Sequence, residues 1–275
     1  MSAGNASSEH IQKFRTAVWK HYREHGRHDL LWRKTKDPYK ILVSEVMLQQ
    51  TQVERVKAFY RAWMKQFPTV RALASASLAE VLKSWQGLGY NRRAKMLHEA
   101  AKAIATAGRF PKTPEELEKL PGIGHYTARA VAAFAHNADV VFVETNLRTA
   151  VIHHFFPRKK KVDDKDILAI LTKAFPHGKA REWYAALMDY GAALKRSGVR
   201  LNAKAKSYTK QSRFRGSARE ARGAILKALV RGSRDTVFLT GILGDDRVVQ
   251  VKSQLASLTK EGLIELSRGT FQLPR

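Results

Sequence analysis

The chain has 275 residues, in which 50 Lys and Arg face 24 Asp and Glu, giving a formal net charge of +26. It has no cysteine, which excludes a disulfide framework, a thiolate-ligated metal or iron–sulfur cluster, and a cysteine nucleophile. No apolar run approaches the roughly 20 residues of a membrane-spanning helix, and residues 1–30 lack the apolar segment of a signal peptide. We therefore expect an intracellular protein that binds a polyanion, nucleic acid rather than a membrane.

The hydrophobic pattern predicts helices along most of the chain. Residues 10–24 carry apolar side chains at helical spacing, which predicts an amphipathic opening helix. From residue 38 to about residue 156, helix-length segments alternate with short turns in which Gly and Pro are found. Another helix is expected over residues 179–195. Strand-like alternation is nearly absent from this region, so we expect it to be all-α.

The remainder of the chain divides into a basic connector and a small separate domain. Residues 195–222 hold ten Lys or Arg and one acidic residue, Glu220, which fits either a solvated linker or a strap that follows phosphates. Residues 218–275 predict three helices and a β-hairpin, an arrangement typical of a winged helix with Arg268 at the tip of the wing. Such a domain could bind DNA or dock a protein.

The segment Leu120–Ala128 (LPGIGHYTA) contains two glycines between the end of one helix and the start of the next. Gly122 and Gly124 allow a tight turn and expose successive backbone N–H groups near a helix N-terminus, which is a phosphate-binding arrangement. A plain helix–helix turn is the alternative for this segment. The apolar residues on either side, which can pack two short helices together, favour the phosphate site.

Two further segments place single carboxylates beside apolar residues. Glu45 lies in a helical segment next to Val46 and Met47, where desolvation would disfavour its charged form and suit it to a general acid. Glu144 follows an apolar run at the start of a predicted helix, where a carboxylate can stabilise an oxocarbenium-like transition state. An exposed helical Glu45 and a Glu144 that only stabilises the helix start are the alternatives.

The hairpin segment resembles the helix-hairpin-helix of base-excision DNA glycosylases, and the resemblance extends in order and spacing over residues 28–195. It implies a mainly α, two-lobed glycosylase domain, to which the small winged-helix-like α/β domain predicted above is added; the C-terminal domain that the family usually carries is not recognisable in residues 218–275. It also implies that Leu120 and Ile123 lend backbone carbonyls to a bound Na⁺ or K⁺, with no other cofactor required. The residues it implies for DNA binding at this segment are Gly122, Gly124, His125 and Thr127.

The expected domain boundaries follow from this resemblance and from the composition. Residues 1–194 would form the glycosylase domain, with a six-helix lobe over about residues 30–136 and a second lobe built from residues 1–29 and 137–194. Residues 195–217 would be the connector and residues 218–275 the winged-helix-like domain.

The string SEVMLQQTQV around Glu45 closely resembles the signature of MutY-type adenine glycosylases. This resemblance implies that Glu45 protonates N7 of a flipped adenine and that Gln50 enters the base stack as a wedge. Tyr90, in the segment GLGYNRRA, matches the aromatic residue that intercalates beside the lesion; a core aromatic is the alternative. Asp189 would face the base pocket.

The chain departs from the family pattern at several places. Glu144 stands where the family has Asp, while Asn146 and Arg148 keep the family positions and are expected to order the loop and contact phosphate. Tyr126 stands where glycosylases with lyase activity carry the Schiff-base lysine, so we expect hydrolysis that stops at an abasic site. The four cysteines of the family's iron–sulfur cluster are absent.

Together these features predict a monofunctional DNA glycosylase of base excision repair, acting on adenine opposite 8-oxoguanine or guanine. A glycosylase for thymine, uracil or another damaged base is one alternative, and a non-catalytic lesion-binding protein is a second. We expect a monomer that binds double-stranded DNA with a mismatch or lesion and no membrane, located in the cytoplasm and nucleoid, or in the nucleus of a eukaryote.

Overall fold

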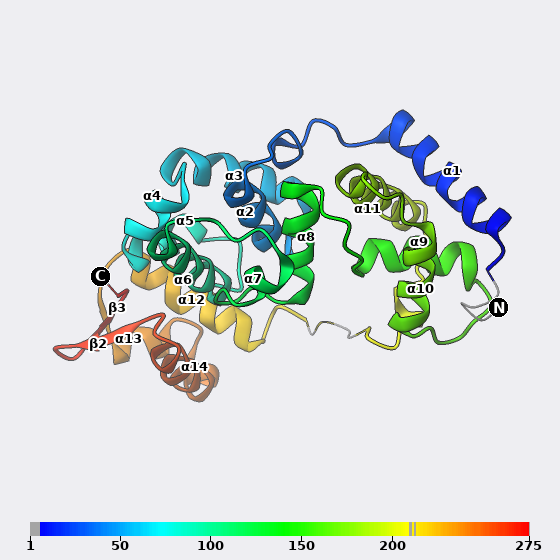
Figure 1. Ribbon diagram of the computed structural model, residues 1–275. Helices are drawn as coiled ribbons and strands as arrows, with labels where there is room; N and C mark the ends of the chain where they lie inside the picture. The colour runs from blue at the N-terminus through cyan, green and yellow to red at the C-terminus, as the bar shows by residue number, and fades with distance from the viewer. Residues whose placement is uncertain (1–5, 209–210, 212, 275) are drawn as a thin grey trace. The chain divides into compact units, whose positions relative to one another are not determined.

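A computed structural model describes residues 6–208, 211 and 213–274 of the chain (Figure 1). These residues form two compact units, each assembled from separate stretches of sequence. The first unit comprises residues 1–42, 112–118 and 124–210, and the second comprises residues 43–111, 119–123 and 211–275.

The first unit is helical, and its core surrounds the aromatic residues Phe14, Trp183 and Tyr184, all fully buried. Helix α11 packs against both α9 and α1. The rings of Phe14 and Trp183 lie edge to face, with their centroids 6.1 Å apart, which is a favourable arrangement of two aromatic rings. Its helices are α1 (Ser8–His25), α7 (Pro114–Glu118), α8 (His125–His136), α9 (Thr145–Phe155), α10 (Asp164–Ala174) and α11 (Ala180–Arg196), with 3₁₀ turns at Leu31–Arg33 and Asn202–Lys204.

The second unit packs a group of helices around Trp63 and Trp85, whose rings meet at a centroid distance of 5.4 Å. Helix α5 begins at a capping box, in which the side chains of Ser77 and Glu80 each accept a hydrogen bond from the other's backbone N–H. Helix α2 (Pro38–Leu48) runs from the first unit into the second. The other helices here are α3 (Val53–Gln66), α4 (Val70–Ser75), α5 (Leu78–Trp85) and α6 (Arg92–Ala107).

The end of the chain folds as three helices and a small antiparallel sheet in the order β1-β3-β2, as expected for a winged helix. Arg268 lies in the turn between β2 and β3 with a φ of 48°, at the predicted tip of the wing. The strand β1 is an addition to the prediction, since two residues are too few to give a strand pattern. The elements are α12 (Ala218–Val230), β1 (Arg234–Asp235), α13 (Thr236–Gly241), a 3₁₀ turn at Asp245–Arg247, α14 (Val248–Lys260), β2 (Glu265–Ser267) and β3 (Thr270–Gln272).

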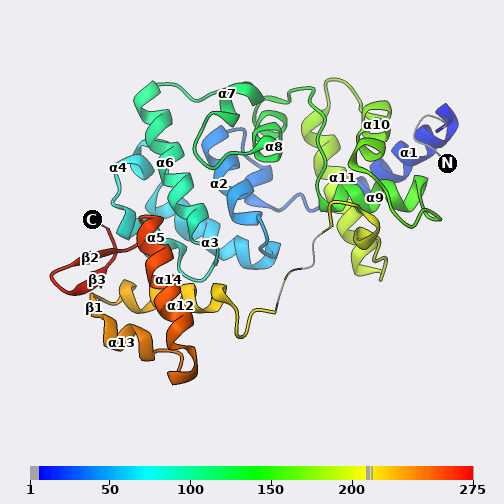
Figure 2. The same cartoon turned by 90° about the horizontal axis from the view of Figure 1, so that it is seen from below.

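This C-terminal domain is part of the second unit rather than a separate body. Helix α12 lies against α5 (Figures 1 and 2), and the N–H of Ala79 donates to the carbonyl of Pro274 at 3.1 Å. The Lys95 ammonium donates to the carbonyl of Glu261 at 2.6 Å. The structure thus groups residues 211–275 with helices α3 to α6, a pairing that hydrophobic periodicity does not reveal.

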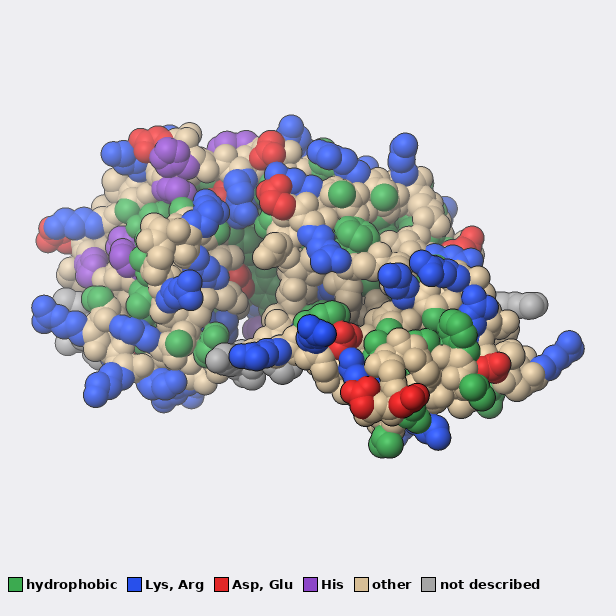
Figure 3. Space-filling model, turned by 180° about the vertical axis from the view of Figure 1, so that it is seen from behind, with side chains coloured by type: hydrophobic (Ala, Val, Ile, Leu, Met, Phe, Trp, Pro, Cys, Tyr) green, Lys and Arg blue, Asp and Glu red, His purple; other side chains and the backbone are tan. Residues whose placement is uncertain are grey.

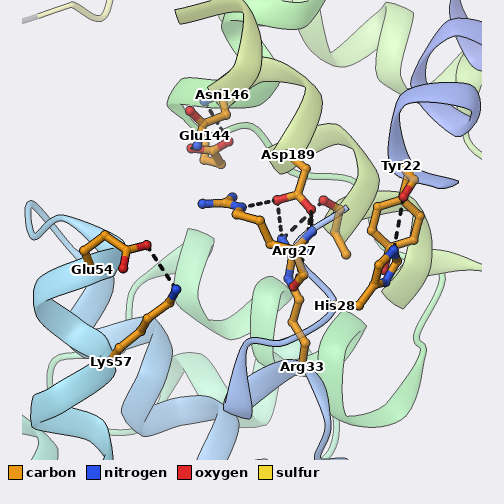
Figure 4. Close-up of polar contacts among 10 residues, drawn as sticks. Tyr22, Arg27, His28, Arg33, Glu54, Lys57, Glu144, Asn146 and Asp189 are labelled. Atoms are coloured by element: carbon orange, nitrogen blue, oxygen red, sulfur yellow. Dashed lines mark hydrogen bonds and ion pairs between the residues drawn. The ribbon is translucent and has the colours of Figure 1, made fainter. Parts of the chain in front are cut away.

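In the first unit, α11 is tied to the segment after α1 by a buried ion-pair cluster around Asp189, which is 2% exposed. Figure 4 shows its carboxylate facing Arg27 and Arg33. Arg33 donates to both carboxylate oxygens, at 2.6 and 2.8 Å, and Nε of Arg27 donates to one of them at 2.6 Å. Burial alone would raise the pKa of Asp189, but the hydrogen bonds and charges of Arg33 and Arg27 more than offset it, so the pKa lies below its usual value.

The Asp189→Asn variant should lose about 3–5 kcal/mol of unfolding free energy, because it leaves two partly buried guanidinium groups without their anion. Since the folded-state pKa is depressed, this stabilisation is complete above the unfolded pKa of about 4 and is lost as the pH falls below it. Urea unfolding of the parent and the variant at pH 7 and at pH 3 measures both effects. Glu182→Gln, at an exposed position of α11, is the control, and an equal loss in both variants would contradict the prediction.

Candidate active site and DNA-binding surface

The two residues predicted to enter the base stack, Gln50 and Tyr90, both have a left-handed backbone conformation, with φ values of 58° and 48°. Few residues other than glycine adopt this region, and a Gln or Tyr there carries about 1–2 kcal/mol of strain. Gln50 follows the end of α2, and Tyr90 lies two residues before the start of α6, where it is 40% exposed. Strain of this kind is concentrated at functional sites, which agrees with the predicted wedge role.

Arg93 joins the two wedge segments. Its guanidinium donates to the carbonyls of Val46 and Gln49 at the end of α2, at 2.7 and 2.5 Å, and to the carbonyl of Gly89 at 3.1 Å. It also lies 5.5 Å from the centre of the Tyr90 ring, within cation–π range. Burial lowers the pKa of Arg93 to about 10, so it stays charged at neutral pH and cross-links the carbonyls of both segments.

A cavity of about 450 Å³ opens beside these residues within the second unit. Gln50 and Tyr90 line it together with Gly122 and Ile123 of the hairpin segment. The structure therefore brings together the predicted wedge residues and part of the predicted phosphate turn. Gln50 and Ile123, for example, are 73 positions apart in the sequence. Arg222 and Glu261 of the C-terminal domain complete the lining, a contribution that the sequence did not indicate.

Glu45, the predicted general acid, is buried in α2 with 5% of its surface exposed. Its neighbours Val46 and Met47 are buried as well, so Glu45 lies in a buried stretch of the helix and not on an exposed helix face. The helix is started by Asp37, whose Oδ1 accepts a hydrogen bond from the N–H of Tyr39 at 2.9 Å, and by Pro38 at the first helical position. The acid role of Glu45 stays a prediction.

The hairpin segment has the local geometry of a phosphate-binding turn. Gly122 has a φ of 72°, and a Cβ there would collide with the side chain of Met96, so glycine is required. Gly124 is the N-cap of α8, and a Cβ there would meet no atom within 4 Å. The N-terminus of α8 is therefore open to an anion, which its backbone N–H groups and helix dipole favour.

The side chains that begin α8 have different surroundings. His125 is exposed and lies 3.2 Å from Glu118, so its ring is accessible beside the turn. Tyr126 packs edge-on against Phe142 at a centroid distance of 5.5 Å, and Thr127 is buried with 3% exposure. Of the three, only His125 has the exposure that a direct contact with DNA needs; the DNA-binding role of Thr127 remains a prediction.

Glu144 is the N-cap of α9. Its Oε1 accepts hydrogen bonds from the backbone N–H groups of Asn146 and Leu147 at 2.7 and 2.9 Å, and its Oε2 accepts one from Nδ2 of Asn146 at 3.2 Å (Figure 4). All three contacts need an acceptor, which suits the ionised carboxylate. Burial raises the pKa of Glu144, and these donors together with the charges of Lys195 and Arg148 oppose that rise. The carboxylate caps the helix and also has an environment fit for electrostatic catalysis.

Two cations lie beside this loop. Arg148 makes two parallel hydrogen bonds with Asp164, at 2.9 and 2.7 Å; its predicted roles in ordering the loop and in contacting phosphate stay predictions. Lys195 donates to Oδ1 of Asn146 at 2.8 Å. Gly191, one turn earlier in α11, lets that helix approach the backbone of Asn146, because any Cβ there would collide with it.

Sequence reasoning missed Arg93, Lys195 and the partners of Asp189. Arg93 was visible only as one of two arginines after Tyr90, and nothing in the sequence showed that it would reach back to α2. Asp189 was expected to face the base pocket, but the structure gives its oxygens to Arg27 and Arg33, which is a structural role; its base-pocket role remains a prediction. Many Lys and Arg side chains lie on the face drawn in Figure 3.

Comparison with known proteins agrees with this geometry. Residues 43–177 match the HhH-GPD superfamily of base excision DNA repair proteins. The chain is 37% identical over 282 aligned residues to the adenine DNA glycosylase of Mycolicibacterium smegmatis, covering 91% of this chain and 92% of that protein. The chain belongs to the adenine DNA glycosylase family. It is a DNA N-glycosylase of base excision repair.

Other adenine DNA glycosylases match over smaller regions. The enzyme of Mycobacterium tuberculosis is 43% identical over 195 residues, which is 67% of this chain and 62% of that protein. The human enzyme is 40% identical over 148 residues, 50% of this chain and 27% of that protein. The M. smegmatis match covers 91% of this chain, so it extends into part of residues 218–275.

Solved structures show the same fold. A thermostable thymine-DNA glycosylase superposes with a TM-score of 0.62 and 27% identity, covering 68% of this chain and 88% of that chain. An endonuclease III in a trapped complex with DNA superposes with a TM-score of 0.57 at 19% identity, which concerns the fold alone. No helix among the described residues is long and apolar enough to cross a membrane, and these residues contain no cluster of three or more His, Cys, Asp or Glu side chains suited to a metal ion.

The Gln50→Gly variant should be as stable as the parent or up to about 1 kcal/mol more stable, because glycine relieves the left-handed strain but loses more entropy on folding. Its rate of base excision should fall about tenfold, since the wedge side chain is gone. Urea unfolding and single-turnover excision measure the two effects. Gln49→Gly is the control, because Gln49 does not have a positive φ and its replacement can only destabilise. A marked loss of stability in Gln50→Gly would contradict the strain argument.

The Lys195→Gln variant should shift the acidic limb of the pH–rate profile to higher pH, because Lys195 lowers the pKa of Glu144 and its removal lets that pKa rise. The plateau rate at higher pH should change little. Single-turnover excision measured from pH 5 to pH 9 tests this, with Arg196→Gln, an exposed neighbour in α11, as the matched control. A uniform fall in rate at every pH would show instead that Lys195 acts only by ordering the loop.

Proposed function

We propose that this enzyme removes adenine mispaired with 8-oxoguanine or guanine in double-stranded DNA, acting as a monomer. The observation that carries the proposal is the burial of Glu45 within the adenine-glycosylase signature segment, at 5% exposure, next to the strained wedge residue Gln50. The match to the M. smegmatis adenine DNA glycosylase over most of both chains supports it.

In the proposed reaction, Glu45 donates its proton to N7 of the extruded adenine. Protonation makes the purine a neutral leaving group, and the glycosidic bond breaks with its electron pair going to the base. The deoxyribose becomes oxocarbenium-like, and the Glu144 carboxylate stabilises that positive charge. Water then adds at C1′ and loses a proton, which leaves free adenine and an abasic site.

The Glu at position 144, where the family has Asp, lengthens the side chain by one methylene. The observed contacts show how the longer side chain is held: two backbone N–H groups and Asn146 fix both oxygens. We propose that these donors keep the carboxylate in place while the sugar charge develops. Electrostatic stabilisation depends on such preorganised groups, because nothing has to reorganise during the reaction.

We propose that the enzyme has no lyase activity and that its hairpin binds a monovalent cation. Tyr126 stands at the lysine position of the lyases and cannot form a Schiff base. The carbonyl of Leu120 accepts one hydrogen bond from the N–H of Ile123 at 3.1 Å and keeps a second lone pair, so it fits as a Na⁺ or K⁺ ligand together with the carbonyl of Ile123. The cation would hold the turn in the shape that presents its N–H groups to a phosphate.

Excision assays on a panel of duplexes test the adenine proposal. The parent should release adenine from A opposite 8-oxoguanine and from A opposite G, and alkali should be needed to cut the strand at the abasic site. Glu45→Gln should lower the single-turnover rate at least about a hundredfold, because general acid catalysis contributes that much or more. Glu54→Gln, at an exposed glutamate of α3, is the control.

A thymine or uracil glycosylase is the second candidate, since a thymine-DNA glycosylase is among the structural matches. A pyrimidine leaves without protonation at N7, so Glu45→Gln would then have only a mild effect. Release of thymine from T opposite G, with no release of adenine from either mispair, would replace the adenine proposal with this one.

A further inference from the structure

A second cavity in the second unit lies between α12 and the loop that carries Tyr90. Its volume is about 830 Å³, nearly twice that of the cavity beside Gln50. One wall is Gly87, Gly89 and Tyr90, and the other is formed by Arg219, Gly223 and Lys227 of α12. Figure 2 shows α12 next to α14. We call this cavity the α12 groove.

The groove has an excess of positive charge. Arg55 lines it from α3, and Arg219 and Lys227 line it from α12. The one acidic residue in its lining, Glu220, is paired with Arg247 at 2.7 Å. Arg222 is likewise committed, through two hydrogen bonds to Glu261. Arg55 donates to the carbonyl of Gly87. With four cations and one carboxylate in its lining, the groove carries a net positive charge that attracts an anion.

The groove begins at the wedge tyrosine. The Arg219 guanidinium lies 5.7 Å from the centre of the Tyr90 ring and donates to the Tyr90 hydroxyl at 3.1 Å. The side-chain amide of Gln211 also donates to this hydroxyl. Residues of the connector and of α12 thus reach the side chain that is predicted to intercalate, so DNA held at Tyr90 would pass the cations of the groove.

Gly223 leaves room for a ligand to approach the backbone of α12 from the groove. Glycine inside a helix destabilises it relative to alanine, and here no packing contact requires it, because a Cβ at Gly223 would meet no atom within 4 Å. Because Gly223 has no side chain, the backbone of α12 is open toward the groove at this position.

The face that a winged helix commonly turns to DNA is less suited to that purpose in this protein. Helix α14, the third helix of the domain, follows two exposed acidic residues, Asp245 and Asp246. Its first turn presents Val249 with 82% exposure. An acidic and apolar start does not match a phosphate backbone, whereas the cations of α12 do.

We propose that the α12 groove is a second DNA-binding site, which holds the phosphodiester backbone next to the intercalated Tyr90 through Arg219 and Lys227. This deepens the proposed function, since it rests on the enzyme's binding duplex DNA through the wedge residues. The C-terminal domain then binds DNA through its first helix and the end of the connector, and its wing and α14 do not carry the contact.

The salt dependence of duplex binding tests the proposal. Each lost phosphate contact lowers the slope of log K against log salt concentration by about one. Lys227→Ala and Arg219→Ala should each lower the slope by about that amount and weaken binding severalfold at about 0.15 M salt. Arg231→Ala is the matched control, because it removes an exposed cation at the end of α12 that does not line the groove. Fluorescence anisotropy with a fully paired duplex and with an A·G duplex supplies the constants, and circular dichroism checks that each variant is folded.

A scan with duplexes that carry single methylphosphonates locates the contact. Neutralising the phosphate at Lys227 should weaken binding by the parent but not by Lys227→Ala, while Arg231→Ala should keep the parent's profile. If both groove variants keep the slope and the methylphosphonate profile of the parent, the proposal is overturned. Because these measurements follow binding and not base release, they give the same answer whether adenine or thymine proves to be the excised base.

Discussion

The second unit depends on one half-buried cation, Arg93, to which no carboxylate among the described residues is paired. Arg93 is held by backbone carbonyls from two segments, the end of α2 and the loop before α6. Carbonyls at the end of a helix lack intrahelical partners and carry the negative end of its dipole, so a guanidinium with several donors satisfies them and is stabilised in return. Gln50 and Tyr90 flank this contact, and their strained conformations persist because Arg93 fixes the chain on both sides.

The first unit uses its carboxylates in two contrasting ways. Asp189 is enclosed by two guanidinium groups, which neutralise its charge and bind α11 to the segment after α1. Glu144 is held by backbone N–H groups and by the amide of Asn146. Lys195 donates to that amide. The negative charge of Glu144 is therefore oriented without being neutralised, as a group that stabilises developing positive charge requires.

The C-terminal domain extends the wedge surface rather than standing apart from it. Lys95 and Ala79 of the helical part contact the backbone of Glu261 and Pro274, and Arg219 reaches Tyr90. A residue expected to enter DNA is thus held both by Arg93 from its own segment and by a helix that follows it by more than a hundred positions. Such a shared contact explains why the domain can take part in DNA binding without using its wing.

The sequence by itself determined the helices, because they follow from apolar spacing. It also supplied the prediction of the phosphate turn, from the glycines between two helices, and the prediction of the acid, from the short signature around Glu45. It also excluded a cysteine-ligated cluster. Only the tertiary structure decided that Arg93 spans two segments, that Asp189 is enclosed by Arg27 and Arg33, and that α12 packs beside Tyr90. Those contacts join residues far apart in the chain, and a guanidinium or carboxylate shows its partner only when folding has brought the two together.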